Sequence, residues 1–113
     1  MRQGEIWEIN LSPTAGAELK KKRPAVIIND DAIGILPLKV IVPITAWQDR
    51  YHGAIWMVRI EPDSENSLSK PSAIDTFQIR SISTKRLLRK IGSVSSKVLG
   101  DVKTAIKAVI DAD

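Results

Sequence analysis

The side chains in this sequence that could do chemistry are mainly cations, hydroxyls and carboxylates. The 113 residues include 17 Lys and Arg, 13 Asp and Glu, one His and no Cys. Two basic runs stand out, one of Lys20, Lys21, Lys22 and Arg23 and the other of Lys85, Arg86, Arg89 and Lys90. Such patches bind phosphates or acidic proteins, although a charge run can equally be a solvated face. The net charge is only +4, so where the cations lie matters more than their number.

Several common kinds of active site have no basis in this sequence. Without Cys there are no disulfides, thiolate zinc sites or cysteine nucleophiles, and a single His52 argues against histidine metal clusters and a Ser-His-Asp triad. The phosphate-loop, dinucleotide, H-E-x-x-H and G-x-S-x-G motifs do not occur. The one adjacent carboxylate pair, Asp30-Asp31, follows an apolar run, where Asp is an ordinary turn residue. We therefore expect no metal and no cofactor.

An enzyme built from these residues would have to work without a metal, a thiol or a histidine. Cleavage of an RNA phosphodiester permits this, because the 2′-hydroxyl of the substrate is a built-in nucleophile. The protein then needs only to align that hydroxyl, accept its proton, protonate the leaving oxygen and stabilise the charge on the phosphate.

Apolar alternation predicts five strands over the first two thirds of the chain. They cover residues 4–11, 25–28, 38–47, 54–61 and 72–82. The run 25–28 is continuously apolar and β-branched, which is typical of a strand buried on both faces. Pro43 cannot donate to a ladder and so marks a bulge or an edge position. In the last strand Gln78 and Arg80 share one face and point the same way.

The hydrophobic period changes to that of an amphipathic helix from residue 95 onward. Its apolar positions are Val98, Leu99, Val102, Ala105, Ile106, Val109 and Ile110. Ser93, Ser95 or Ser96 could cap its start, while Gly100 weakens it by up to about 1 kcal/mol. Short strands followed by one helix predict a single domain over residues 1–113, mainly β, whose small sheet or barrel the helix covers.

We expect the protein to be cytoplasmic and to have no membrane contact. No apolar run approaches the roughly 20 residues that cross a bilayer. Glu5 and Glu8 interrupt the first residues, where a secretory leader would need unbroken apolar character.

Five segments together, in their order and spacing, closely resemble the MazF/PemK toxins of bacterial toxin-antitoxin systems. They are Gly4-Glu5-Ile6-Trp7, residues 11–18 (LSPTAGAE), residues 23–28 (RPAVII), Val42-Pro43-Ile44-Thr45 and residues 77–82 (FQIRSI). The resemblance implies an SH3-like small β-barrel with a C-terminal helix, and a homodimer. It also implies a metal-independent ribonuclease that cuts single-stranded RNA, including mRNA, at short sequences. A cognate antitoxin would block its site.

The same resemblance assigns catalytic roles. Arg23 matches the family's catalytic arginine and Thr45 its catalytic threonine. A guanidinium can grip a phosphate oxygen bidentately, and a hydroxyl can both donate and accept near the same centre. Glu18 resembles an acidic site residue of some members, although it could simply pair with a lysine. The expected products are a 2′,3′-cyclic phosphate and a 5′-hydroxyl.

Further residues are expected to bind the RNA. They are Lys20, Lys21, Lys22, Trp47, Asp75, Gln78, Arg80 and Arg86. Trp47 could stack on a base, whereas Trp7 and Trp56 are assigned to the core. Asp75 could accept from a base edge such as a cytosine amino group, or could be a structural acceptor. Arg80 could contact phosphate or brace a dimer.

Alternatives remain at this point. Arg23 could be one more solvated charge, Thr45 only a β-former, and His52 a surface residue outside the site. Leu19 and Lys21 depart from the family's usual Gln and Gly, so the RNA target cannot be inferred from relatives. The main alternative function is a binding module on the same barrel that holds DNA or poisons a topoisomerase without cutting RNA. A weaker one is an inert relative that keeps only dimerisation and antitoxin binding.

Overall fold

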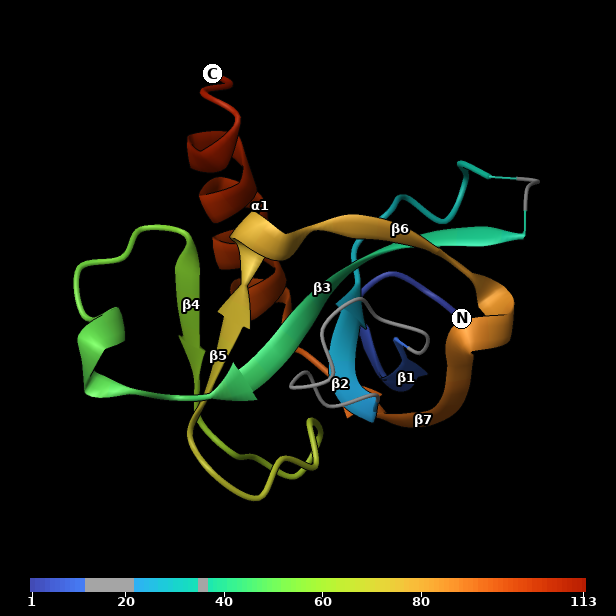
Figure 1. Ribbon diagram of the computed structural model, residues 1–113, viewed down its shortest axis with the longest axis horizontal. Coiled ribbons are helices and arrows are strands. Elements are labelled where there is room, and N and C mark those ends of the chain that lie inside the picture. Colours follow the sequence, from blue (N-terminus) through green and yellow to red (C-terminus); the bar gives the residue numbers. More distant parts are fainter. Residues whose placement is uncertain (12–21, 35–36) are drawn as a thin grey trace.

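The computed structural model describes residues 1–11, 22–34 and 37–113. In this part of the chain seven strands and three short 3-10 helices precede one C-terminal α-helix (Figure 1). The strands are β1 (Glu5–Asn10), β2 (Lys22–Ile27), β3 (Leu38–Ala46), β4 (Met57–Ile60), β5 (Ser72–Asp75), β6 (Arg80–Ser83) and β7 (Leu87–Ser93). The helices are η1 (Asp49–Tyr51), η2 (Thr76–Gln78), η3 (Thr84–Arg86) and α1 (Ser96–Val109).

Strand β3 organises the sheet because it changes partner along its length. The strands pair in the order β4-β5-β3-β2-β1-β7, and β6 pairs with β3 as well. Residues 38–41 of β3 pair with β6, whereas residues 44–46 pair with β5. Pro43 lies between these two ladders while staying in register with Ala25 of β2. The interruption expected at Pro43 is therefore the point at which β3 changes its neighbour.

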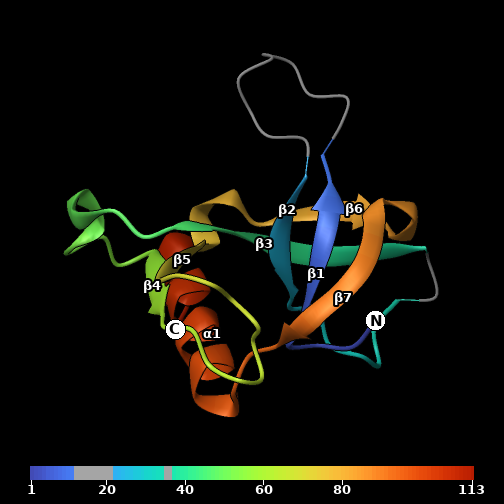
Figure 2. The same cartoon turned by 90° about the horizontal axis from the view of Figure 1, so that it is seen from below.

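The two faces of this bent sheet bury two separate clusters. Strands β1, β2, β3, β6 and β7 enclose Ile9, Ala25, Ile27, Ile41, Ile82 and Leu87. Trp7 and Leu11 pack against this cluster, on the face expected from the alternation of the first strand. Because five strands surround one cluster, this part of the sheet curls into a small open barrel (Figure 2). A mainly β, barrel-like fold with a C-terminal helix is confirmed.

Helix α1 covers the other face of the sheet, beside β4 (Figure 2). Its buried Val102 joins a second cluster composed of Ile6, Val26, Val42, Ile44, Ile60 and Ile74. Of the three candidate caps, Ser95 is the residue used, and its hydroxyl accepts from the backbone N–H of Val98 at 3.1 Å. None of the helices in the described residues has the length and apolar character needed to cross a membrane.

The strand expected over residues 72–82 is wrong as one continuous element. It is split into β5, η2 and β6, because the Asp75 side chain caps η2 by accepting from the Phe77 backbone N–H. The Thr76 hydroxyl adds to the break by donating to the Trp56 carbonyl at 2.6 Å. Gln78 therefore lies in η2, so the shared strand face expected for Gln78 and Arg80 is not formed.

Three further features differ from the sequence-based expectations. Strand β7 was not expected, because its exposed Leu88, Arg89 and Lys90 hide the usual alternation. Trp56 was expected in the core, but it is 40% exposed and makes an edge contact with the Phe77 ring. The strand predicted over 54–61 begins only at Met57, and Trp56 lies in the preceding turn.

Candidate functional site

A cavity of about 510 Å³ lies where β2 and β3 leave the barrel. Its lining residues from these strands include Lys22, Arg23 and Thr45. Arg23 and Thr45 each lie two residues beyond Ala25–Pro43, the last pair of the β2–β3 ladder, and both line the cavity. Two residues far apart in the sequence thus meet at one cavity.

The Arg23 guanidinium is held in a way that leaves hydrogen-bonding capacity unused. Arg23 is half-buried, and Pro24, which fixes the backbone beside it, lines the same cavity. Its Nε atom is buried and has no hydrogen-bond partner among the residues that the structure describes. A buried donor without a partner is costly, so a ligand oxygen at this position would be favoured.

The segment that joins β4 to β5 also lines this cavity. Leu68, Ser69 and Lys70 contribute to the lining, and Ser72 of β5 completes it. Among the described residues that line this cavity none is a carboxylate, and the charged ones are the three cations Lys22, Arg23 and Lys70. None of these three forms an ion pair with another described residue. Three unpaired cations around one hollow make a binding site for an anion.

A second cavity, of about 600 Å³, contains the predicted RNA-binding residues Asp75 and Gln78. The Asp75 carboxylate is engaged within the protein: Oδ1 accepts from the Phe77 backbone N–H at 3.1 Å, and Oδ2 accepts from Gln78 Nε2 at 2.7 Å. Two roles were considered for Asp75, contact with a base edge and acceptance of hydrogen bonds within the protein. The second is the one present in this structure. This bond orients the Gln78 amide, whose side chain is exposed.

The rest of the second cavity comes from a segment that sequence reasoning left outside the site. Arg50, Tyr51, His52 and Trp56 line it, together with Gly53, Ala54 and Met57. The only feature of the sequence that could have indicated this cavity is the cluster of aromatic residues between 47 and 56. For the first cavity, nothing in the sequence singled out Lys70, which stands in an ordinary polar loop.

Trp47 lines neither cavity but supports the second. The Arg59 guanidinium carbon lies 4.8 Å from the centroid of the Trp47 ring. The Tyr51 and His52 rings make edge contacts with it, at centroid distances of 5.7 and 5.3 Å. Trp47 Nε1 is buried without a hydrogen-bond partner among the described residues. Stacking of Trp47 on a base stays a prediction, and in this structure its neighbours are protein side chains.

Arg80 and Arg86 lie outside both cavities. Arg80 is exposed at the start of β6. Arg86 Nη1 donates to the Asn10 carbonyl at 3.0 Å. Because Asn10 of β1 pairs with Lys22 of β2, Arg86 lies at the same end of the sheet as Lys22. Their contact with RNA stays a prediction. Glu18, Lys20 and Lys21 lie outside the described residues.

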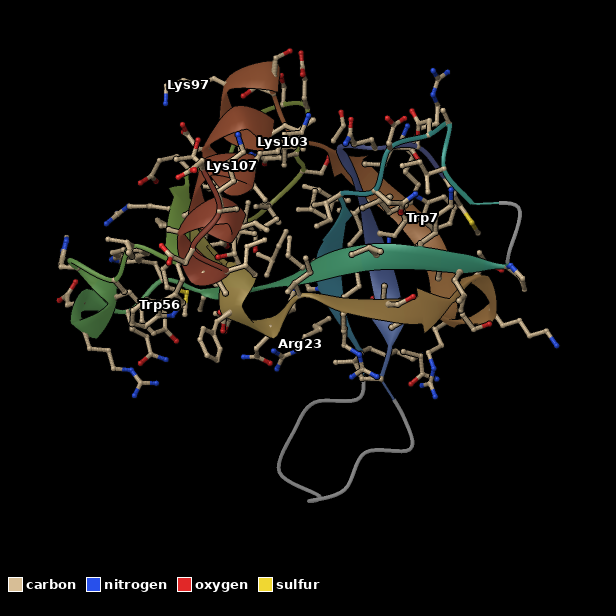
Figure 3. The ribbon with its side chains drawn as sticks, turned by 90° about the horizontal axis from the view of Figure 1, so that it is seen from above. Trp7, Arg23, Trp56, Lys97, Lys103 and Lys107 are labelled. Carbon is tan, nitrogen blue, oxygen red and sulfur yellow. The ribbon has the colours of Figure 1, made fainter. Side chains whose placement is uncertain are left out.

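The second basic run is partly neutralised by β1. Lys90 lies 3.1 Å from Glu5 and Arg89 lies 3.6 Å from Glu8, because β7 and β1 are neighbours. Burial by itself would raise the pKa of Glu5, but hydrogen bonds from the Trp7 indole, the Arg2 backbone and Lys90 outweigh it and lower that pKa to about 2. Arg89 and Lys90 are thus engaged with carboxylates of β1, whereas the three cations at the first cavity have no ion pair among the described residues. Figure 3 shows Arg23 at the lower edge of the molecule, far from Lys97 and Lys103 of α1.

Comparison with known proteins gives one consistent family. The sequence profile of the PemK-like, MazF-like toxins of type II toxin-antitoxin systems matches residues 2–110. The chain is 32% identical to "Endoribonuclease MazF9" of Mycobacterium tuberculosis, covering 98% of this chain and 97% of that protein. It is 34% identical to "Endoribonuclease MazF" of Staphylococcus saprophyticus, covering 94% and 88%. A solved "Endoribonuclease in complex with its cognate antitoxin" from a mycobacterial species has the same fold, with a TM-score of 0.79, 15% identity, and 100% and 97% coverage.

Proposed function

Because this chain belongs to the PemK-like, MazF-like family of type II toxins, we propose that it is an endoribonuclease toxin that cleaves single-stranded RNA, including mRNA, and so stops translation and growth. The observation that carries the proposal is the cavity at which Arg23 and Thr45 meet. Its described lining holds three cations without an ion pair to another described residue and no carboxylate, which suits a phosphodiester.

The reaction follows from what these two side chains can do. The 2′-oxygen of the nucleotide before the cut attacks phosphorus, and the bond from phosphorus to the 5′-oxygen breaks. The 2′-hydroxyl loses its proton and the leaving 5′-oxygen gains one, which gives a 2′,3′-cyclic phosphate and a 5′-hydroxyl. Arg23 stabilises the added negative charge on the non-bridging oxygens through the N–H groups of its guanidinium. The Thr45 hydroxyl fixes the phosphate by donating to it.

The second cavity supports a base contact next to the cut. Ser72 lines the first cavity and Asp75 the second, three residues further along β5. Gln78, oriented by Asp75, keeps a carbonyl oxygen and one N–H for a base edge.

Partners and location complete the proposal. Membership in a family of type II toxins supports a cognate antitoxin as partner. We propose that this antitoxin blocks the cavity and that the working form is a homodimer. The mycobacterial structure of the same fold holds an antitoxin. We place the activity in the cytoplasm, where mRNA is translated, and we propose that it needs no metal or cofactor.

The test is cleavage of a long single-stranded RNA by purified protein in the presence of EDTA, with the ends mapped. Wild type should cut at a short sequence, and Arg23→Ala should lose at least 100-fold in rate. Lys103→Ala, on the outer side of α1, is the matched control for loss of one cation. Absence of cleavage by wild type, or equal cleavage by Arg23→Ala, would favour the binding-module alternative. Cleavage that EDTA abolishes would refute the metal-free reaction.

A further inference from the structure

We infer that Lys70 is a phosphate-binding residue of this same site, held in place by the folded segment between β4 and β5. The inference rests on the proposed function and adds a residue to it. Lys70 lines the first cavity together with Arg23 and Thr45, and strand β3 lies between β5, which follows Lys70, and β2, which carries Arg23. A phosphate in the cavity would thus have both a guanidinium and an ammonium in its surroundings.

The segment that carries Lys70 is built around one buried amide. Asn66 is fully buried, and its Oδ1 accepts from the backbone N–H groups of Asp63 and Leu68, each at 3.0 Å. Its Nδ2 donates to the Glu61 carbonyl at 2.9 Å, and its own backbone N–H reaches the Asp63 carboxylate at 2.7 Å. These bonds fix the turns that lead to Lys70.

Contacts on both sides hold the segment against the domain. The Glu65 carbonyl accepts from the Ser93 backbone N–H at 3.0 Å. At Gly92 a Cβ would come within 2.3 Å of that carbonyl oxygen, so the segment lies directly on β7. Leu68 packs against the core cluster beneath α1. The Ser72 hydroxyl donates to the Lys70 carbonyl at 2.9 Å, which ties Lys70 to β5.

The electrostatics favour an anion in this cavity. Lys70 has no ion pair among the residues that the structure describes, and the described lining of the cavity contains no carboxylate. Lys22 and Arg23, which line the same cavity, repel Lys70 until a negative group enters. A lysine is a flexible point charge, so it should bind the phosphate similarly in the ground state and in the transition state. Its loss should therefore raise KM more than it lowers kcat.

The experiment uses an oligonucleotide that carries the cleavage site mapped on long single-stranded RNA. Lys70→Ala should raise KM about tenfold with kcat changed less than about threefold, and Lys70→Arg should restore most of the loss. Lys70→Ala should also reduce the dependence of log affinity on log salt by about 0.7, the share of one phosphate contact to a single strand. Lys103→Ala should change neither quantity.

Binding of a non-cleavable version of the oligonucleotide, with a 2′-deoxy residue at the cut, separates the two claims. If wild type cleaves no RNA, the proposed function fails and no cut can be mapped, while a tenfold weaker binding of long single-stranded RNA by Lys70→Ala would still support the phosphate contact. If Lys70→Ala has the same KM, binding and salt dependence as the wild type, the inference is overturned. A change in KM with an unaltered salt dependence would also overturn it, since that outcome indicates a structural effect.

Discussion

Replacing Asn66 tests whether one buried side chain builds a wall of the site. Asn66→Ala removes the two hydrogen bonds accepted by Oδ1 and the one donated by Nδ2. Each buried backbone group left unpaired costs about 1–1.5 kcal/mol, but water can reach the exposed Glu61 and Asp63. We therefore expect a loss of about 2–3 kcal/mol of unfolding free energy, or about 10 °C in Tm for a domain of this size.

Urea and thermal unfolding followed by circular dichroism measure this change. Ser64→Ala, an exposed position in the same segment, is the matched control and should change stability by less than about 0.5 kcal/mol. At temperatures where the variant is still folded, KM for RNA should rise, because Lys70 is no longer held at the cavity. A loss below about 0.5 kcal/mol for Asn66→Ala would refute the reasoning.

Three further predictions concern stability elsewhere in the domain. Gly100→Ala in the exposed middle of α1, where an added Cβ meets nothing within 4 Å, should raise unfolding free energy by up to about 1 kcal/mol in urea titrations, and any destabilisation would contradict this. Gly92→Ala should cost about 1–3 kcal/mol, because its Cβ would press on backbone atoms of Glu65 and Asn66; unchanged urea unfolding would show that the segment can shift freely. The pKa of Glu5 is lowered from 4.5 to about 2, so its contribution is complete above pH 4.5 and is lost as the pH falls toward 2. After discounting for solvent screening, this contribution is about 1–2 kcal/mol. Glu5→Gln should therefore flatten the dependence of unfolding free energy on pH between 4.5 and 2. A pH dependence identical to that of the wild type would contradict this role of Glu5.

Local patterns were enough to predict much of the fold. After residue 95 the apolar residues are spaced by three and four, which predicted the helix and the burial of Val102, since helix periodicity depends only on near neighbours. The face shared by Trp7, Ile9 and Leu11 was right for the same reason. The break at η2 was missed because it depends on what the Asp75 side chain accepts, which a hydrophobic pattern does not contain.

The site was predicted only in part, and the reason is the register of the sheet. Arg23 and Thr45 were named from the resemblance, and their meeting at one cavity follows from the pairing of β2 with β3. The wall that carries Lys70 depends on the packing of Asn66 against β7, a contact between distant segments. Likewise, Arg89 and Lys90 could not be separated from a free basic patch before their pairing across β1 was known.

The central claim is that the RNA supplies its own nucleophile to a cavity in which Arg23 stabilises the phosphate. The most direct measurement replaces the one ribonucleotide before the mapped cut by its 2′-deoxy form and follows cleavage in EDTA. Our account predicts no cleavage at that bond, unchanged binding, and a cyclic phosphate end only on the unmodified substrate. Cleavage of the deoxy-substituted bond at the wild-type rate would contradict it.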